Sequence, residues 1–456
     1  MAENQVSQVK QKADIVSVID SRIKLQKSGR NLKAVCPFHG EKTPSFFVSP
    51  EIQTFKCFGC GEGGDVFTFL QKYEGMNFPE SLEYLANKVG VKLKSDFRTG
   101  DEQKRKRLLE ILHLTEEYYH FLLIEHKIGR RALNYLKKRG IGKILIKQFK
   151  LGYSLDSWDE LQKYLVRKKK YEIGELEKVG LVIRSTRGGY YDRFRGRVMF
   201  PLKDIQGKTL GFSGRVLPGE GVNEKEAKYI NSPETQLYHK SQMLYGLFEV
   251  RSDIKRKDFI VVTEGELDMV SSFKAGVRNV VAVKGSALTQ DQVGLIRRLT
   301  TNIVLALDAD DAGTEATRRG IEVADSLGMN LSVVEVTEGK DPDDLARNDP
   351  EGWKKLVLKP ESVYDYLIRK ALEKQDVSTG PGKKAVSKDL APLLAKISNA
   401  VERDHYVKQV SEKLGVSRRV FEEEVIKAEK IGKTSSTSKK VVSSDKKLSR
   451  RERLEQ

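Results

Sequence analysis

The sequence predicts a multidomain α/β protein: a small N-terminal ribbon with paired metal ligands, an α/β core that contains a parallel sheet flanked by helices, and a helical C-terminal region. Three observations predict this organisation. Cysteine and histidine pairs fall within residues 36–60, four short apolar runs alternate with helical patterns between residues 258 and 345, and helical patterns continue through residues 350–430. The length of 456 residues exceeds what one hydrophobic core organises, so we expect several domains.

Changes in composition along the chain give the expected boundaries. The N-terminal segment opens with an amphipathic helical pattern, and a short charged segment then leads into an arginine-rich α/β stretch. The Ser- and Lys-rich tail lacks aromatic residues, so we expect it to be disordered. The predicted units are residues 1–95, the ribbon domain; 96–107, a linker; 108–255, the first part of the core; 256–345, the parallel-sheet domain; 346–430, the helical region; and 431–456, the tail.

The chain is strongly basic, with 82 lysines and arginines against 64 aspartates and glutamates and a net charge of +18. Such an excess favours a polyanionic partner, because neutralising phosphates releases condensed counterions; a merely well-hydrated surface is the alternative. No apolar run approaches the length of a membrane span, and the N-terminus lacks a secretory pattern. The odd count of three cysteines argues against a disulfide framework. We therefore expect a cytoplasmic protein that binds nucleic acid and no membrane.

Two ligand pairs with two-residue gaps predict a structural zinc site. Cys36 and His39 form the first pair, and Cys57 and Cys60 form the second. Tetrahedral zinc takes four such ligands, and each tight gap lets one turn present two of them. A redox Cys-x-x-Cys motif and a histidine of the core are the alternatives, but no βαβ unit precedes Cys57 and all three cysteines fall in one ligand set. Because the protein fills all four positions, we expect one structural zinc with no position open to water.

The segment between the two ligand pairs predicts a hairpin, which is the layout of a zinc ribbon. Residues 46–48 and 52–55 are rich in strand-forming residues and flank a turn at residues 49–51. Four phenylalanines lie in or beside this hairpin, and each has two interpretations, packing in the core or stacking on unpaired DNA bases. They are Phe46, Phe47, Phe55 and Phe58.

Acidic residues follow three of the four predicted parallel strands. The strands are residues 259–263, 279–283, 303–307 and 331–336, and the acids are Glu264 and Asp268, then Asp308 and Asp310, then Asp341 and Asp343. Ligands bind at the carboxyl ends of parallel strands, so these acids should meet at one edge, where they would repel one another unless cations lay among them. Oxygen ligands alone select Mg²⁺ or Mn²⁺, and we expect two ions. A single Asp-x-Asp is more often a turn or a helix cap, but three acidic strand ends favour metal binding.

On these motifs and their order, the sequence resembles the bacterial replicative DNA primase family over nearly all of residues 1–430. The Cys-His-Cys-Cys pattern looks like that family's zinc ribbon, and the acidic strand ends look like the toprim domain that the family shares with topoisomerases. Further similar segments are residues 135–140, 192–201, 211–215 and 228–235. The resemblance implies that residues 108–255 are the basic, template-binding part of the RNA polymerase core and that residues 256–345 are the toprim catalytic domain.

The resemblance also implies roles for single residues. The acids Glu264, Asp308 and Asp310 would bind the catalytic magnesium, with Glu264 also assisting proton removal, and Asp268, Asp341 and Asp343 would complete the acidic patch. The cations Arg139, Arg215, Lys228 and Lys240 would guide phosphates of the template or the nucleotide.

Three further arginines alternate with other residues in a way that predicts a basic strand. Arg193, Arg195 and Arg197 would project from one face of such a strand, where guanidinium groups suit phosphate oxygens. For any single one of these cations, a solvated or salt-bridged role is the alternative.

The function that the resemblance implies is that of a DNA primase, a DNA-dependent RNA polymerase that makes short RNA primers on single-stranded DNA during replication. Its substrates would be ribonucleoside triphosphates, and we expect a monomer. Residues 385–427 look like the first part of the family's helicase-binding region, but its terminal helical hairpin is not apparent, so we expect a weakened or altered contact with the replicative helicase. The alternatives are a toprim nuclease or strand-breaking enzyme and a catalytically inactive zinc adaptor that binds DNA.

Overall fold

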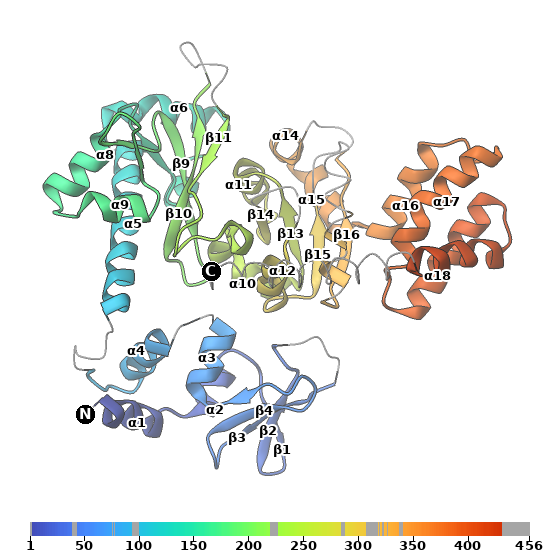
Figure 1. Cartoon of the computed structure of the whole chain (residues 1–456), viewed down its shortest axis with the longest axis horizontal. Coiled ribbons are helices and arrows are strands. Elements are labelled where there is room, and N and C mark those ends of the chain that lie inside the picture. Colours follow the sequence, from blue (N-terminus) through green and yellow to red (C-terminus); the bar gives the residue numbers. More distant parts are fainter. Residues whose placement is uncertain are drawn as a thin grey trace, which may run out of the picture.

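The chain was examined as a computed structural model (Figure 1), which describes residues 2–38, 43–74, 76, 78–93, 100–218, 227–283, 288–306, 318, 320–321, 323–325, 327–336 and 341–430. Three predicted site residues, His39, Asp308 and Asp310, lie outside the described residues, as does the predicted disordered tail.

A five-stranded antiparallel sheet, in the order β1-β2-β3-β4-β5, forms the ribbon domain together with four helices. The predicted hairpin is confirmed, since Val48 on β3 pairs with Phe55 on β4. The amphipathic pattern near the N-terminus is split between α1 and α2, because the Asp14 carboxylate accepts the backbone N–H groups of Val16 and Ser17 and so starts a new helix. The elements are α1 (Ala2–Lys12), α2 (Ile15–Asp20), β1 (Gln26–Ser28), β2 (Asn31–Ala34), β3 (Phe46–Ser49), β4 (Thr54–Cys57), β5 (Gly63–Gly64), α3 (Val66–Glu74) and α4 (Phe78–Lys88).

The arginine-rich part of the chain is built on a four-stranded antiparallel sheet, ordered β11-β10-β9-β6, beside the small β7–β8 hairpin. The long helix α5 packs across this sheet against β6 and β10, and it begins at Gly100, so residues 100–107 of the predicted linker are helical. The elements are α5 (Gly100–Ile124), η2 (Lys127–Gly129), α6 (Arg130–Lys138), α7 (Lys143–Gln148), β6 (Gly152–Ser154), α8 (Glu160–Gln162), η3 (Lys163–Lys168), α9 (Ile173–Lys178), β7 (Val182–Arg184), β8 (Tyr190–Asp192), β9 (Arg197–Lys203), β10 (Thr209–Val216), β11 (Tyr229–Asn231) and η4 (Lys240–Gln242).

The strand predicted to carry three arginines on one face is wrong. Residues 193–196 connect β8 to β9, and only Arg197 belongs to a strand. Phe194 is buried in the core beneath this connection, and Gly196 has a φ of 61°, a left-handed conformation that interrupts extended chain. The alternation of charged and other residues here therefore reflects a turn that buries one ring.

A six-stranded sheet, in the order β12-β14-β13-β15-β16-β17, forms the centre of the molecule. Its four inner strands run parallel, as predicted, and bury valine and isoleucine side chains. The two edge strands run antiparallel and were not predicted; each has two residues, too few for a periodic pattern. The elements are β12 (Leu244–Tyr245), α10 (Leu247–Lys257), β13 (Ile260–Thr263), α11 (Glu266–Lys274), β14 (Val280–Val283), α12 (Gln290–Arg297), β15 (Asn302–Leu305), β16 (Asn330–Val333), α14 (Pro342–Asn348), α15 (Pro350–Leu358) and β17 (Glu361–Ser362).

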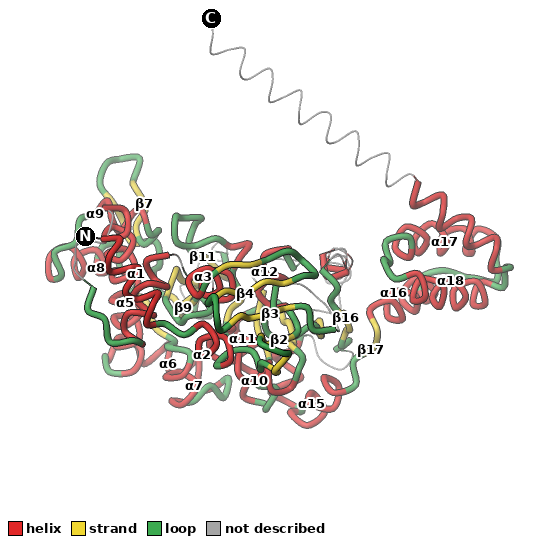
Figure 2. The backbone as a smooth tube through the Cα atoms, turned by 90° about the horizontal axis from the view of Figure 1, so that it is seen from below, coloured by secondary structure: helices red, strands yellow, loops and turns green. Residues whose placement is uncertain are grey.

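The C-terminal region is helical, as predicted, and lies at one end of the molecule in both views (Figures 1 and 2). It consists of α16 (Val363–Glu373), α17 (Gly380–Leu394), α18 (Ala400–Leu414) and a last helix over residues 418–430. Ion pairs from Arg369 and Lys370 on α16 to Glu335 beyond β16 join this region to the sheet. Across the part of the chain that the structure describes, no helix combines the length and apolar character needed to cross a membrane.

The ribbon domain docks on the amino-end edge of the parallel strands. Tyr73 of α3 accepts hydrogen bonds from Lys255 Nζ on its hydroxyl (3.2 Å) and from Arg298 Nη1 on its carbonyl (3.5 Å). Lys255 lies shortly before β13, and Arg298 ends α12, so both residues lie at that edge. A further ion pair joins Lys208 to Glu80 of α4 (3.0 Å). The ribbon domain and the carboxyl ends of the strands are therefore on opposite sides of the sheet domain (Figure 1).

Candidate functional site

The three cysteines of the ribbon domain form one cluster. The Sγ atoms of Cys36, Cys57 and Cys60 all lie within 4.8 Å of one another, and Cys36 and Cys60 are 3.9 Å apart. Tetrahedral zinc with Zn–S bonds of about 2.3 Å separates its sulfur ligands by about 3.8 Å, so the geometry fits zinc. Burial raises the pKa of the Cys57 thiol, but hydrogen bonds from Ser45 and from backbone N–H groups outweigh it and lower the pKa overall, which favours the thiolate ligand.

The exposed face of the ribbon sheet carries cations beside aromatic rings. Lys33, Phe47 and Lys56 are direct cross-strand neighbours on β2, β3 and β4, which places them on one face. Phe58 is 73% exposed, and its ring packs edge-to-face on Phe47 with centroids 5.5 Å apart. By contrast, Phe46 and Phe55 are buried and stack on each other, so they belong to the core. This face has the composition of a surface that stacks nucleic-acid bases.

The acidic edge of the parallel sheet is assembled from strand ends and helix starts. Glu264 directly follows β13, and Asp268 lies in the first turn of α11, where its carboxylate accepts the Gly265 N–H (2.9 Å). The residues after the neighbouring strand β15 include Asp308 and Asp310, which the structure does not describe. On α14, which packs against α11, carboxylate oxygens of Asp341, Asp343 and Asp344 lie within 4.8 Å of one another. Oxygen donors of this kind fit Mg²⁺ or Mn²⁺.

Asp343 differs from the other acids because it is 3% exposed and held by cations of the chain itself. Its Oδ2 atom accepts hydrogen bonds from Arg139 Nη1 (2.5 Å), and the Arg347 Nε atom lies 3.1 Å away. Its other oxygen accepts the Ser271 hydroxyl of α11. Two predicted site residues from different parts of the sequence, Arg139 and Asp343, are thus brought into one buried ion pair.

Arg215 lies close to Arg139, because both contact the same ring. Its Nη1 atom donates to the Tyr229 hydroxyl at 2.7 Å, and both guanidinium groups lie over the ring of Tyr135. Burial raises the pKa of Tyr229 to about 12, and the Asp268 carboxylate contributes to this rise, so Tyr229 and Arg215 lie near the acidic edge. The structure thus brings cations of the first part of the core up to the acids of the sheet domain.

The remaining predicted cations are distributed differently. Lys228 is exposed next to β11, and Lys240 is exposed in η4, just before β12. Because Leu244 of β12 pairs with Val283 at the carboxyl end of β14, Lys240 lies on the same side of the sheet as the acids. Arg197 is buried and donates to the carbonyls of Gly214 and Ala227, which is a structural role.

Arg195 lies away from the acidic edge and reveals a residue that sequence reasoning missed. Its guanidinium lies 4.1 Å from the ring centre of Trp158 and 5.4 Å from that of Tyr191. Trp158 is 63% exposed, which is unusual for tryptophan in a folded domain. The signal in the sequence is a tryptophan within a polar segment, without an apolar periodic pattern to bury it. Arg193 turns its side chain inward, and burial lowers its pKa.

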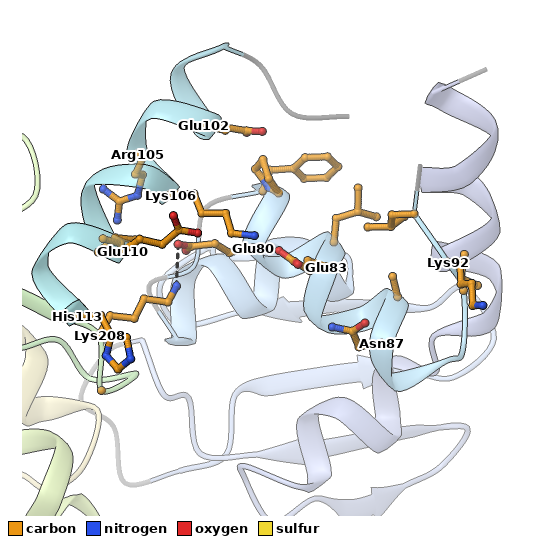
Figure 3. Close-up of a pocket in the computed structure, with 18 of the residues that line it drawn as sticks. Glu80, Glu83, Asn87, Lys92, Glu102, Arg105, Lys106, Glu110, His113 and Lys208 are labelled. Carbon is orange, nitrogen blue, oxygen red and sulfur yellow. Dashed lines mark hydrogen bonds and ion pairs between the residues drawn. The ribbon is translucent and has the colours of Figure 1, made fainter. Parts of the chain in front are cut away.

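A cavity of about 1050 Å³ lies between α4 and α5, where the ribbon domain meets the core (Figure 3). Its charged lining includes the Glu80–Lys208 ion pair as well as Glu110 and His113. None of the predicted site residues lines it, so it is separate from the acidic edge.

Four segments of the chain match known protein families. Residues 1–101 match the family described as CHC2 zinc finger, residues 118–251 the DNA primase catalytic core, N-terminal domain, residues 261–346 the Toprim-like family, and residues 364–419 the DnaB-helicase binding domain of primase.

Whole-chain relatives agree with these segments. The chain is 37% identical over 426 residues to a DNA primase of Clostridium acetobutylicum, which covers 92% of this chain and 69% of that protein. It is 36% identical to a DNA primase of Geobacillus stearothermophilus, over 94% of this chain and 72% of that protein. Among solved structures, the zinc-binding and RNA polymerase domains of the Aquifex aeolicus primase match 91% of this chain and 98% of that chain, with a TM-score of 0.60 and 33% identity. A DnaG primase catalytic domain bound to single-stranded DNA matches 69% of this chain and 98% of that chain, with a TM-score of 0.60 and 28% identity.

Proposed function

This chain belongs to the bacterial DNA primase family, and from that premise we propose how its residues divide the work of primer synthesis. The protein is an RNA-polymerising nucleotidyltransferase. The observation that carries the proposal is that cations of the first part of the core reach the acidic edge of the sheet domain. Arg139 pairs with Asp343 on α14, and Arg215 donates to Tyr229, whose pKa is raised in part by Asp268.

The acidic edge would hold magnesium or manganese through Glu264, with Asp308 and Asp310, which follow β15 in the sequence, and with Asp268 and Asp341. When bound there, such ions stabilise the charge that develops as one phosphate bond forms and another breaks. Glu264 also receives the proton that leaves the attacking 3′-hydroxyl. Asp268 fixes the start of α11 through Gly265, which keeps this turn beside Glu264.

The cations orient the reacting phosphates. Arg139 and Arg215 bind phosphate oxygens of the nucleotide, and the exposed Lys228 and Lys240 extend the positive surface toward the template. Guanidinium groups suit this task because their planar donors match pairs of phosphate oxygens. Catalysis of this kind rests on positioning and charge stabilisation, which needs few covalent contributions from the protein.

The ribbon domain binds the single-stranded template through the face that carries Lys33, Phe47, Lys56 and Phe58, with Cys36, His39, Cys57 and Cys60 holding one structural zinc. Trp158 and Arg195 form a second contact for an unpaired strand. A similar DnaG primase catalytic domain has been solved bound to single-stranded DNA, which supports a contact between the core and the template. Residues 364–419, which match a helicase-binding family, give the chain its contact with the replicative helicase. We further propose that the protein acts as a monomer.

The test is primer synthesis by the purified chain with a single-stranded template, magnesium and labelled ribonucleotides. We expect new RNA, and Glu264→Gln should lower its yield at least about 100-fold while template affinity stays within about twofold. Glu110→Gln, a matched change in the cavity between α4 and α5, should leave the yield unchanged.

Two outcomes would count against the proposal. RNA made by Glu264→Gln at the parental rate would remove this residue from the site. Shortening of an end-labelled DNA strand without any new RNA would favour the nuclease alternative.

A further inference from the structure

Tyr135 presents its ring to two arginines. It lies on α6, one helical turn before Arg139, whose guanidinium carbon is 5.5 Å from the ring centre. Arg215 comes from β10, a distant part of the sequence, and its guanidinium carbon is 5.8 Å from the same ring centre. Both distances fall within the range in which a cation is attracted to an aromatic face. A single ring thus contacts two cations that would otherwise repel each other.

Each of these guanidinium groups is also fixed on its other side. Arg139 donates to Asp343 on α14, and Arg215 donates to the Tyr229 hydroxyl on β11. Asp343 is itself held by Arg347 and by the Ser271 hydroxyl, so it is a rigid anchor. One nitrogen of each guanidinium makes these contacts, and each group has five N–H donors in all, so further donors remain for a ligand.

The two arginines lie beside the acidic edge, where the proposed function puts the reacting phosphates. Arg139 contacts the helix that carries Asp341, and Arg215 contacts Tyr229, whose pKa is raised in part by Asp268. Both cations therefore adjoin the acidic edge, whereas Arg195 pairs with Trp158 in a different place. A triphosphate carries several anionic groups in a row, so it suits a site with two arginines beside an acidic edge that would hold divalent cations.

We propose that Tyr135 is a positioning residue, which holds Arg139 and Arg215 at a fixed spacing as a clamp for the triphosphate of the incoming ribonucleotide. This inference rests on the proposed function, because it assigns the nucleotide to the same acidic edge. Holding the two cations in place before binding spares the entropy of ordering two long side chains when the nucleotide arrives. We assign this role to the ring, and Tyr135→Phe tests the hydroxyl separately.

The experiment compares Tyr135→Leu, which removes the aromatic face, with Tyr135→Phe, which keeps it. In steady-state RNA synthesis, Tyr135→Leu should raise KM for ribonucleotides about tenfold and change kcat by less than about threefold, and Tyr135→Phe should stay within about twofold of the parent in both. Direct titration of a labelled ribonucleoside triphosphate into the full chain, with magnesium and no template, should show the same order of affinities. Tyr164→Leu is the matched control. It also removes a ring that lies under a cation, Lys169, but this pair involves neither Arg139 nor Arg215.

The outcomes separate this inference from the proposed function. If the parent makes no RNA, the proposed function itself fails. If the parent is active and Tyr135→Leu keeps the parental KM, or if Tyr135→Phe is as weak as Tyr135→Leu, the ring does not position the arginines. An equal rise in KM for Tyr164→Leu would also overturn the inference. Should Tyr135→Leu lower the thermal midpoint by more than about 5 °C, Tyr135→Met, which also lacks an aromatic face, replaces it.

Discussion

Within the ribbon domain, residues of the same type have opposite surroundings. Phe46 and Phe55 are buried beneath the sheet, whereas Phe58, one residue beyond Cys57, is 73% exposed. The difference follows from the pleat, because alternate strand residues face opposite sides, and from the knuckle, which turns Phe58 away from the core. Mutations at neighbouring positions should therefore separate the loss of zinc from the loss of the proposed template-binding surface.

Cys57→Ser should abolish zinc binding and reduce template binding by the full chain. A serine hydroxyl is a poor zinc ligand, and Cys57 is a buried member of the thiol cluster. Metal analysis of the purified variant should give less than about one-tenth of a zinc per chain against about one for the parent. Phe58→Leu is the control, with zinc retained and template affinity lowered about fivefold by loss of a stacking ring. Stoichiometric zinc in Cys57→Ser would contradict the ligand assignment.

Asp192 should make the thermal stability depend on pH. Burial raises its pKa to about 7, and Asp159 and Glu160 add to the rise, although the N–H groups of Leu161 and Gln162 oppose it. A folded-state pKa above the unfolded value of about 3.9 means that the folded state holds a proton more tightly, so this contribution to stability is lost as pH rises toward and through 7. The fall should amount to roughly 1–3 kcal/mol between pH 5 and pH 8.

Thermal midpoints of the parent and Asp192→Asn at those two pH values measure the effect. The parent should lose more stability than the variant on going to pH 8, because an amide does not titrate in this range. An equal loss in both proteins would show that Asp192 is not the group responsible. Asp159→Asn, a change at a half-buried neighbour, should retain most of the parental pH dependence.

At the scale of whole elements, the sequence predicts long or periodic pieces well and short ones poorly. The four parallel strands follow from runs of buried valine and isoleucine, and the hairpin between the ligand pairs follows from strand-forming residues around a turn. The edge strands β12 and β17 carry two residues each and have no pattern to detect. The predicted basic strand is wrong because Phe194 is buried and Gly196 turns the chain. The burial of Phe194 depends on tertiary packing, which the local sequence pattern does not report.

The same limit applies to the candidate site. Strand ends indicate where Glu264 and Asp268 lie, since the geometry of a parallel sheet fixes its carboxyl edge. The pairing of Arg139 with Asp343 joins residues far apart in the chain, and no local pattern reports such a contact. Trp158 was missed for the same reason, because its partner Arg195 follows a different strand.

Trp158→Ala should weaken binding of single-stranded DNA about tenfold at moderate salt, because the exposed ring and the Arg195 guanidinium form a platform for a base. Fluorescence anisotropy with a labelled oligonucleotide measures this affinity. Phe121→Ala, which removes another exposed ring from α5, should leave the affinity within about twofold. Equal affinities for the parent and Trp158→Ala would rule out the platform.

At the scale of the whole molecule, the ribbon domain is held to the sheet domain by few polar contacts. Lys255 and Arg298 converge on Tyr73, and Lys208, which precedes β10 in the first part of the core, pairs with Glu80. Burial lowers the pKa of Arg298, which shows how closely the two surfaces meet at this point. These contacts set the orientation of the ribbon domain with respect to the core.

Replacing both Lys255 and Arg298 with alanine should loosen the ribbon domain without unfolding it, because neither side chain belongs to the ribbon's own core. Small-angle scattering should show a larger radius of gyration than for the parent, and zinc content should stay the same. The double variant Lys383→Ala and Lys384→Ala on α17 is a charge-matched control and should scatter as the parent does. An unchanged radius for the Lys255 and Arg298 variant would show that other contacts fix the orientation.

The docking of the ribbon on the amino-end edge has a consequence for how a template is threaded. The ribbon domain and the acidic edge lie at opposite ends of the parallel strands (Figure 1). A strand that touches both must travel around the flank of the sheet domain, so the nucleotides gripped by the ribbon and the nucleotide being copied are separated along the DNA. The docked position of the ribbon domain therefore sets how many nucleotides of template separate the ribbon-bound segment from the nucleotide being copied.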